Sequence, residues 1–103
     1  MAYTLRWTGP TQNTDGSAFD QSQFAGYELD LDGQPAVAVP VGYDTDNQYE
    51  FDLRSLSGFS FGTHTARVRV VNRLGNRSDF SNQVSFTHAD ERVPNPPLSL
   101  VAV

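Results

Sequence analysis

The clearest strand signal in the chain is the stretch Ala66-Arg67-Val68-Arg69-Val70-Val71. Apolar side chains at positions 66, 68 and 70 alternate with arginines at 67 and 69. A period of two places successive side chains on opposite faces of a strand, and this alternation is typical of an antiparallel sheet with one buried face. The stretch therefore predicts a β-strand whose valines face a core and whose arginines face outward.

The same period recurs in short segments along the chain. The apolar residues of these segments are Tyr3, Leu5 and Trp7; Tyr27, Leu29 and Leu31; Val37, Val39 and Val41; Tyr49, Phe51 and Leu53; and Val84 and Phe86. Turns are expected at 32–33 and 74–76, and the polar segment 11–23 is expected to be a loop. No amphipathic helix of three turns can be drawn, so roughly six strands remain, as in an antiparallel sandwich.

Composition limits both the size and the chemistry of the protein. The chain has 103 residues, enough for one domain, and it has no cysteine, which excludes disulfides and thiolate chemistry. Seven basic residues against twelve acidic ones leave a formal charge of −5, so nucleic acid and anionic membranes are not expected partners. The longest apolar run, 36–41, is far shorter than the ~20 residues of a spanning helix, and no secretion signal follows Met1, so a soluble protein is expected.

The strand pattern returns once more at the end of the chain. A polar linker at 89–97 ends in two prolines and is followed by the apolar segment Leu98-Ser99-Leu100-Val101-Ala102-Val103. We therefore divide the chain into a sandwich at 1–88, a linker at 89–97 and a terminal strand at 98–103. A strand with no later strand in the sequence is expected to find its partner elsewhere.

Several stretches together resemble a fibronectin type III domain of the bacterial and bacteriophage type. The resemblance covers residues 5–86 and is carried by Leu5-Arg6-Trp7-Thr8-Gly9-Pro10-Thr11, by Asn13-Thr14-Asp15-Gly16-Ser17 with Phe24-Ala25-Gly26-Tyr27-Glu28-Leu29, by residues 62–72, and by Phe80-Ser81-Asn82-Gln83-Val84. It implies an all-β, antiparallel, immunoglobulin-like β-sandwich with Trp7 in its core.

Two departures from the family pattern matter. His64 stands where the family has a corner tyrosine, and its imidazole N–H can bond back to the loop before the strand as the tyrosine hydroxyl does. The family's first strand is missing, because only residues 1–3 precede the second one, and the proline-rich segment 94–103 resembles that first strand. The expected fold is therefore a fibronectin type III-like sandwich with its first strand displaced to the C-terminus.

The terminal strand has three open fates. It is donated to a neighbouring subunit or another partner by strand addition, it returns to the empty position in its own chain, or it is disordered in isolation. In the first two cases its partner is the strand of Leu5 and Trp7. Return is geometrically allowed because residues 87–97 span up to ~36 Å at ~3.3 Å each. Donation is the preferred hypothesis, and a fragment cut from a repeat array is a further alternative.

Aromatic residues in loops and apolar residues of the terminal strand are the candidate contact sites. Phe59 and Phe61 lie in one glycine-bounded loop and Tyr43 lies in another, where they either contact a partner or pack under the loops. The predicted partner-binding residues are Phe59, Phe61, Tyr43, Leu98, Leu100, Val101 and Val103.

Other clusters are expected to be structural. The strand aromatics at positions 7, 27, 49 and 51 are expected in the core rather than on a sugar-binding platform. The aspartates at 30, 32, 44 and 46 lack EF-hand spacing, and those at 30 and 32 are expected on a solvated face, where Arg67 and Arg69 pair with such carboxylates across strands. His64 and His88 are the only histidines, and no Gly-x-Ser-x-Gly turn is present, so no catalytic triad is expected.

These observations favour assembly over catalysis. We expect a non-enzymatic structural protein without a cofactor, a small bacteriophage virion component of capsid, neck or tail, which attaches through loops and its C-terminal strand. Its expected partners are other virion proteins or copies of itself, with no nucleic acid and no membrane. The alternative is an accessory or carbohydrate-binding module of a secreted, extracellular bacterial glycosidase, which would bind a surface glycan.

Overall fold

The computed structural model describes residues 3–56, 59–90 and 92–103. Within these ranges the chain forms six strands and one short 3-10 helix, which are β1 (Thr4–Thr8), β2 (Phe24–Leu31), β3 (Val37–Val39), β4 (Gln48–Asp52), η1 (Leu53–Ser55), β5 (Gly62–Asn72) and β6 (Val84–His88). All strand pairings are antiparallel, which confirms the predicted all-β class. Met1, Ala2, Ser57, Gly58 and Glu91, which fall in the predicted sandwich and linker, lie outside the described residues.

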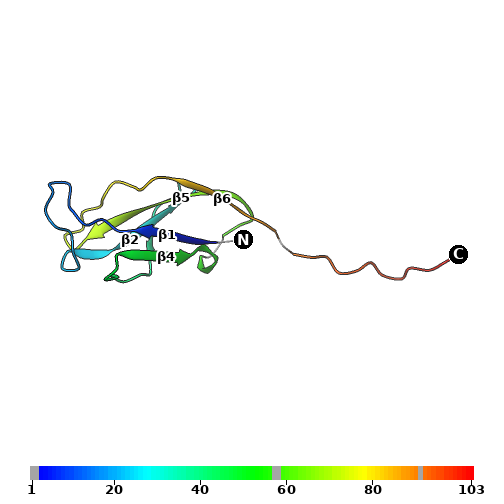
Figure 1. The fold of residues 1–103 in the computed structure, drawn as a ribbon. Helices are drawn as coiled ribbons and strands as arrows, with labels where there is room; N and C mark the ends of the chain where they lie inside the picture. The colour runs from blue at the N-terminus through cyan, green and yellow to red at the C-terminus, as the bar shows by residue number, and fades with distance from the viewer. Residues whose placement is uncertain (1–2, 57–58, 91) are drawn as a thin grey trace.

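The strands form two sheets (Figure 1). β1 pairs with β4, and the strands β3, β2, β5 and β6 form a four-stranded sheet in that order. β5 is the longest strand and lies between β2 and β6. Its alternating side chains explain this central position, because Ala66, Val68 and Val70 are all buried, at 2%, 7% and 8% exposure.

Side chains from both sheets share one hydrophobic core. Its most deeply buried members are Leu29 of β2 and Leu53 of η1, each 1% exposed. The predicted core positions of the strand aromatics are confirmed, because those at 27, 49 and 51 are buried and Trp7 packs against them, with its ring 6.0 Å from that of Tyr49. These rings therefore contribute to packing inside the protein and leave no platform on its surface.

Two strands end earlier than the two-residue period predicts. β4 ends at Asp52, because its carboxylate accepts a hydrogen bond from the Arg54 N–H at 2.9 Å and starts the 3-10 turn that contains Leu53. β3 ends at Val39, because Pro40 has no N–H to donate to the β2 ladder. Leu53 and Val41 still pack in or against the core, so the period was right about burial and wrong about strand length.

Gly9 lies just after β1, where the chain touches the loop before β4. Its N–H donates to the Asn47 carbonyl at 2.9 Å, and its carbonyl accepts from Asn47 Nδ2 at 2.6 Å. A Cβ at Gly9 would collide with Asn47 Oδ1 and lie 2.5 Å from Tyr27 Oη. We therefore expect Gly9→Ala to lower the free energy of unfolding by about 1–3 kcal/mol in urea denaturation. Gly42→Ala is the matched control, because no heavy atom lies within 4 Å of its added Cβ, and equal losses in the two variants would contradict this packing.

Candidate functional site

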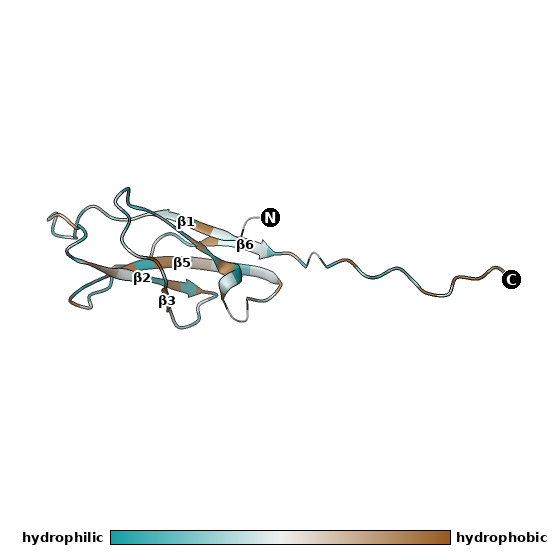
Figure 2. Cartoon of the chain, turned by 90° about the horizontal axis from the view of Figure 1, so that it is seen from below, coloured by the Kyte–Doolittle hydropathy of each residue, from teal (hydrophilic) through white to brown (hydrophobic). Residues whose placement is uncertain are grey.

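Residues 92–103, which we call the tail, extend away from the two sheets (Figure 1). The molecule measures 80 × 26 × 19 Å, and the tail lies along the long dimension. No part of the tail forms a strand. Apolar residues colour parts of the tail brown in Figure 2. The large ones are 73% exposed or more: Val93, Leu98, Leu100, Val101 and Val103. In the single chain the predicted terminal strand at 98–103 is thus neither paired nor covered.

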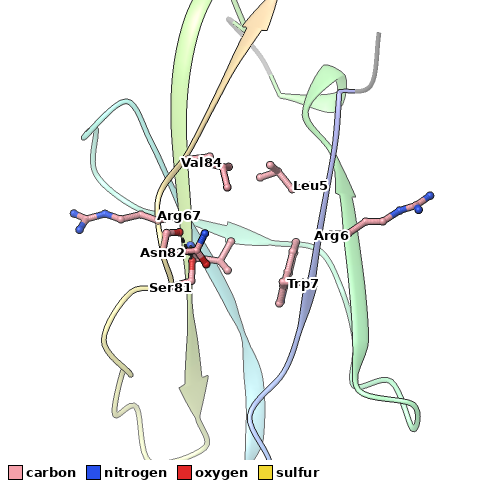
Figure 3. Close-up of a pocket in the computed structure, with 9 residues that line it drawn as sticks. Leu5, Arg6, Trp7, Arg67, Ser81, Asn82 and Val84 are labelled. Atoms are coloured by element: carbon pink, nitrogen blue, oxygen red, sulfur yellow. Dashed lines mark hydrogen bonds between the residues drawn. The ribbon is translucent and has the colours of Figure 1, made fainter.

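β1 is paired along only one edge within the described residues. It pairs with β4 from Thr4 opposite Asp52 to Thr8 opposite Gln48. The Leu5 and Trp7 side chains point from β1 toward Val84 of β6 and toward Ser81 and Asn82, which lead into β6 (Figure 3). The Tyr3 ring, just before β1, lies 4.8 Å from the His88 ring at the end of β6, and Trp7 near the end of β1 lines a cavity with Ser81 and Asn82 just before β6. The two strands therefore run in opposite directions.

An apolar groove separates β1 from β6. It contains a cavity of about 100 Å³ whose apolar lining comes from Leu5, Trp7, Ala66, Val68 and Val84. The arginines at 6 and 67 border this cavity, but their charged ends point away from it (Figure 3). Beyond Trp7 lies a second hollow of about 480 Å³, which shares Trp7, Val68 and Ser81 with the first. Its lining is more polar and includes Arg69, Arg77 and Asp79. We call the two hollows together the β1–β6 groove.

Two serines hold residues 78–81, which border the groove opposite β1, against β5. The Ser78 N–H donates to the Val70 carbonyl at 2.9 Å, and Ser78 Oγ accepts from the Val70 N–H at 3.0 Å. Ser81 makes the same two bonds to Val68, at 2.7 and 3.1 Å. Each serine satisfies both backbone groups of one β5 residue, so residues 78–81 follow β5 without a regular strand ladder.

The predicted contact residues Phe59 and Phe61 lie where the tail begins. The Phe59 ring stacks on His88 at 4.1 Å and is partly buried, whereas Phe61 is 47% exposed and lies 4.8 Å from His88. The Arg92 guanidinium lies 5.0 Å from the Phe61 ring centroid and 2.6 Å from Asp90. We call this end of the molecule the exit end, because the first residue of the tail is held there.

Tyr43, the third predicted loop contact, lies apart from these two. Its ring is partly buried and sits 5.6 Å from the ring of Phe24, a core residue. The structure thus brings Phe59 and Phe61 together at the exit end, places Tyr43 against the core and leaves the four predicted tail contacts exposed.

His64 links two loops at its end of β5. Its Nδ1 lies 2.5 Å from Asp32 Oδ2, and its Nε2 lies 2.7 Å from the Ser60 carbonyl. The second contact confirms the expected bond from His64 to the loop before its strand. Both partners are acceptors, so the doubly protonated ring, which donates from both nitrogens, satisfies both. The bond to Asp32, with that to Ser60, raises the pKa of His64 above its usual range, and the same bond lowers the pKa of Asp32.

The His64–Asp32 pair predicts a pH-dependent stability. The folded pKa of His64 lies above 6.5, so its contribution is complete below pH 6.5 and is lost as pH rises through the folded value. The folded pKa of Asp32 lies below 3.8, so its contribution is complete above pH 3.8 and is lost as pH falls through the folded value. We therefore expect the wild-type Tm to fall as pH rises above 6.5 and through the folded pKa of His64, and to fall less in His64→Gln. Parallel Tm curves for the two proteins would contradict the pairing.

Both outward arginines of β5 pair across strands, Arg67 with one of the predicted aspartates and Arg69 with Glu28, which was not among the predicted partners. Arg67 Nε lies 2.9 Å from Asp30, and Arg69 Nε lies 2.8 Å from Glu28, and each pair is directly opposite in the β2–β5 register. Both guanidinium groups also lie over the Phe80 ring, at 4.2 and 4.6 Å from its centroid. These contacts tie the outer face of the four-stranded sheet to the segment that borders the groove.

The predicted solvated position of Asp30 is wrong. Asp30 is 6% exposed, because the Arg67 side chain pairs with it and the Gly33 N–H donates to it at 2.8 Å. Asp32 accepts from His64 and from the Thr65 N–H at 2.9 Å. The alternation placed both aspartates opposite the core, and Asp32 is exposed there as predicted. It could not show that the Gly33 turn and Arg67 would cover Asp30.

Comparison with known proteins gives no relative. No protein-family model, no curated protein and no solved structure matches the chain. Within 3–56, 59–90 and 92–103, no three metal-binding side chains lie together, and no helix is long and apolar enough to cross a bilayer. The fold and the site define a class only, which is an all-β protein of antiparallel sheets with an open apolar groove and an exposed apolar tail.

Sequence reasoning found one wall of the groove and missed the other. It named the strand of Leu5 and Trp7 as the partner of a terminal strand, but it placed Val84 and the residues before it only in the last strand and its turn, without a part in the contact. The available signal was the pair Ser78 and Ser81 in a stretch without apolar alternation, which indicates that side chains, rather than a strand ladder, bond to β5.

Proposed function

We propose that the chain is a fibronectin type III-like β-sandwich that serves as a non-enzymatic assembly protein, a small component of a bacteriophage virion. The strand order supports the fold proposal, because β1-β4 and β3-β2-β5-β6 are the two sheets expected of that family when its first strand is absent. The bond from His64 to Ser60, in the place of the family's tyrosine corner, supports it as well.

The observation that carries the assembly role is the exposure of the tail. Leu98 and Leu100 are 89% and 97% exposed, and no described residue of the chain covers them. Soluble proteins rarely leave a contiguous apolar segment in water unless a partner covers it. An extended apolar segment suits strand addition, in which main-chain hydrogen bonds supply affinity and alternate side chains fill pockets.

The virion assignment rests on the resemblance of residues 5–86 to bacteriophage and bacterial domains. It is tested by peptide mass spectrometry of phage particles purified by density gradient from the organism that encodes the chain. We expect peptides of this chain at a constant ratio to the other virion proteins across the particle band. Their absence from particles, with the protein free in the lysate, would contradict the assignment.

The glycosidase-module alternative has weaker support. A sugar-binding platform needs exposed aromatic rings in a row, whereas the strand aromatics at 27, 49 and 51 are at most 9% exposed. Phe61, at 47% exposure, is a single exposed ring and is already contacted by His88 and Arg92. Saturable binding of a soluble glycan, measured by titration calorimetry, would favour this alternative over the virion role.

A further inference from the structure

We infer that the β1–β6 groove accepts residues 98–103 of a second copy of this chain, so that copies join head to tail. The inference rests on the proposed assembly function and names the partner and the acceptor site. Its donor and its acceptor both lie on the described chain. The donor is the exposed tail, and the acceptor is the edge of β1 that does not pair with β4.

The tail segment and the groove match in length and in chemistry. Six residues at ~3.3 Å span about 20 Å, and the five residues of β1, Thr4–Thr8, span about 17 Å at the same rise. No side chain from Val93 to Val103 is charged, and the groove interior between Leu5, Trp7 and Val84 is apolar. With a period of two, Leu98 and Leu100 enter the groove while Ser99 and Val101 face outward.

Backbone pairing with β1 completes the smaller sheet. An edge strand presents unpaired N–H and C=O groups, which are a template for a strand from another chain. A third strand beside β1 would turn the two-stranded sheet into a three-stranded one, and two-stranded sheets are only marginally stable by themselves. Ser99 has a φ of 61° in the single chain, so the segment becomes a regular strand only when this residue returns to the extended region, which serine adopts readily.

Strand direction gives the arrangement of the copies. A segment antiparallel to β1 is parallel to β6, so it runs toward the exit end of the chain that accepts it. The tail of the donating chain also leaves toward its own exit end (Figure 1). Donor and acceptor therefore point the same way along the long axis, and the contact joins two different surfaces. Such heterologous contacts build rings or open filaments rather than closed dimers.

The start of the tail favours a second copy over return to the same chain. Arg92 is held at the exit end by Phe61 and Asp90, and the tail points onward from there. Three of the four residues 94–97 are prolines, which favour an extended and semi-rigid spacer. To enter the groove of its own chain, the tail would have to reverse direction and pass the whole length of the groove before residues 98–103 could run parallel to β6.

Cysteine cross-linking of the full chain tests the inference, because the chain has no cysteine of its own. Arg6 faces outward on β1 and Val101 is the outward residue of the tail segment, so Arg6→Cys in one chain and Val101→Cys in another place two thiols on adjacent strands. The two variants are mixed and oxidised mildly. Ser99→Cys, mixed with Arg6→Cys in the same way, tests a strand pairing shifted by two residues. We expect the yield of mixed disulfide dimers to be at least about ten-fold above that of the control, because strand pairing holds the two thiols at a millimolar effective concentration.

The control replaces Arg6→Cys with Ala38→Cys on β3, an exposed edge strand of the other sheet. Chains that carry both Arg6→Cys and Val101→Cys should form a ladder of dimers, trimers and longer species. A double variant that closes only on itself, or mixed dimers no more frequent than with Ala38→Cys, would overturn the inference. Either result would leave the virion assignment standing, since that is tested by the presence of the chain in particles.

Discussion

Replacing Leu98 and Leu100 with aspartate is expected to convert the assembled protein into folded monomers. Each leucine contributes about 1.5–3 kcal/mol when its side chain is buried, and an unpaired aspartate in the groove adds a desolvation cost. The combined loss of at least about 3 kcal/mol weakens association more than 100-fold. Sedimentation velocity across a concentration series measures this change directly. The Tm of the monomer should stay close to that of the dilute wild type, because the tail packs on no core residue.

The matched control for this double variant is Val93→Asp. Val93 is 87% exposed and belongs to the tail, but it lies before the prolines and outside the segment that enters the groove. We expect Val93→Asp to assemble as the wild type does. Equal loss of assembly in both variants would mean that the tail acts through general hydrophobicity rather than through residues 98–103.

Leu29→Ala is expected to be the most destabilising single substitution in the body of the protein. Leu29 is 1% exposed and lies in β2, opposite Val68 of β5. Truncation of a fully buried leucine costs about 2–5 kcal/mol, through lost burial and the cavity that remains. In a domain of this size that loss lowers the Tm by roughly 10–20 °C, measured by thermal unfolding of the dilute protein.

Leu74→Ala is the matched control for the core substitution. Leu74 is 86% exposed in the turn after β5, so its truncation should change the free energy of unfolding by less than about 0.5 kcal/mol. A loss at Leu74 as large as at Leu29 would contradict the position of the core between the two sheets.

The strands of this protein could be predicted because burial and the two-residue period agree along most of them. The period identified six strands, and the two errors at their ends have local causes, a side-chain cap at Asp52 and a missing N–H at Pro40. A hydrophobic pattern reports which side chains face the core, and Leu53 and Val41 do so. It does not report whether the backbone beneath them stays in a ladder.

The candidate site was less accessible to sequence reasoning. The exposed tail and the edge beside Leu5 and Trp7 follow from the pattern, but the groove between them depends on how the two sheets face each other. The burial of Asp30 and the shared acceptor at Ser60, which both His64 and His88 contact at 2.7 and 2.9 Å, arise from contacts between residues far apart in sequence. Such contacts leave no periodic signal.

A head-to-tail join by strand insertion also makes the linker a determinant of assembly geometry. Residues 94–97 span roughly 12 Å at ~3.1 Å each in a proline-rich extended conformation, which sets the spacing between copies. Each copy contributes one tail and one groove, so growth stops only where a ring closes or another protein supplies the last strand.

The most direct test of strand insertion is amide hydrogen exchange of the full chain as a function of its concentration. The account predicts that residues 4–8 of β1 and residues 98–103 gain protection together as concentration rises, because the two segments form one ladder between copies. It would be contradicted if the amides of 98–103 exchange freely at every concentration at which the protein is assembled. It would also be contradicted if they are already protected in the monomer, since that result means that the tail occupies its own groove.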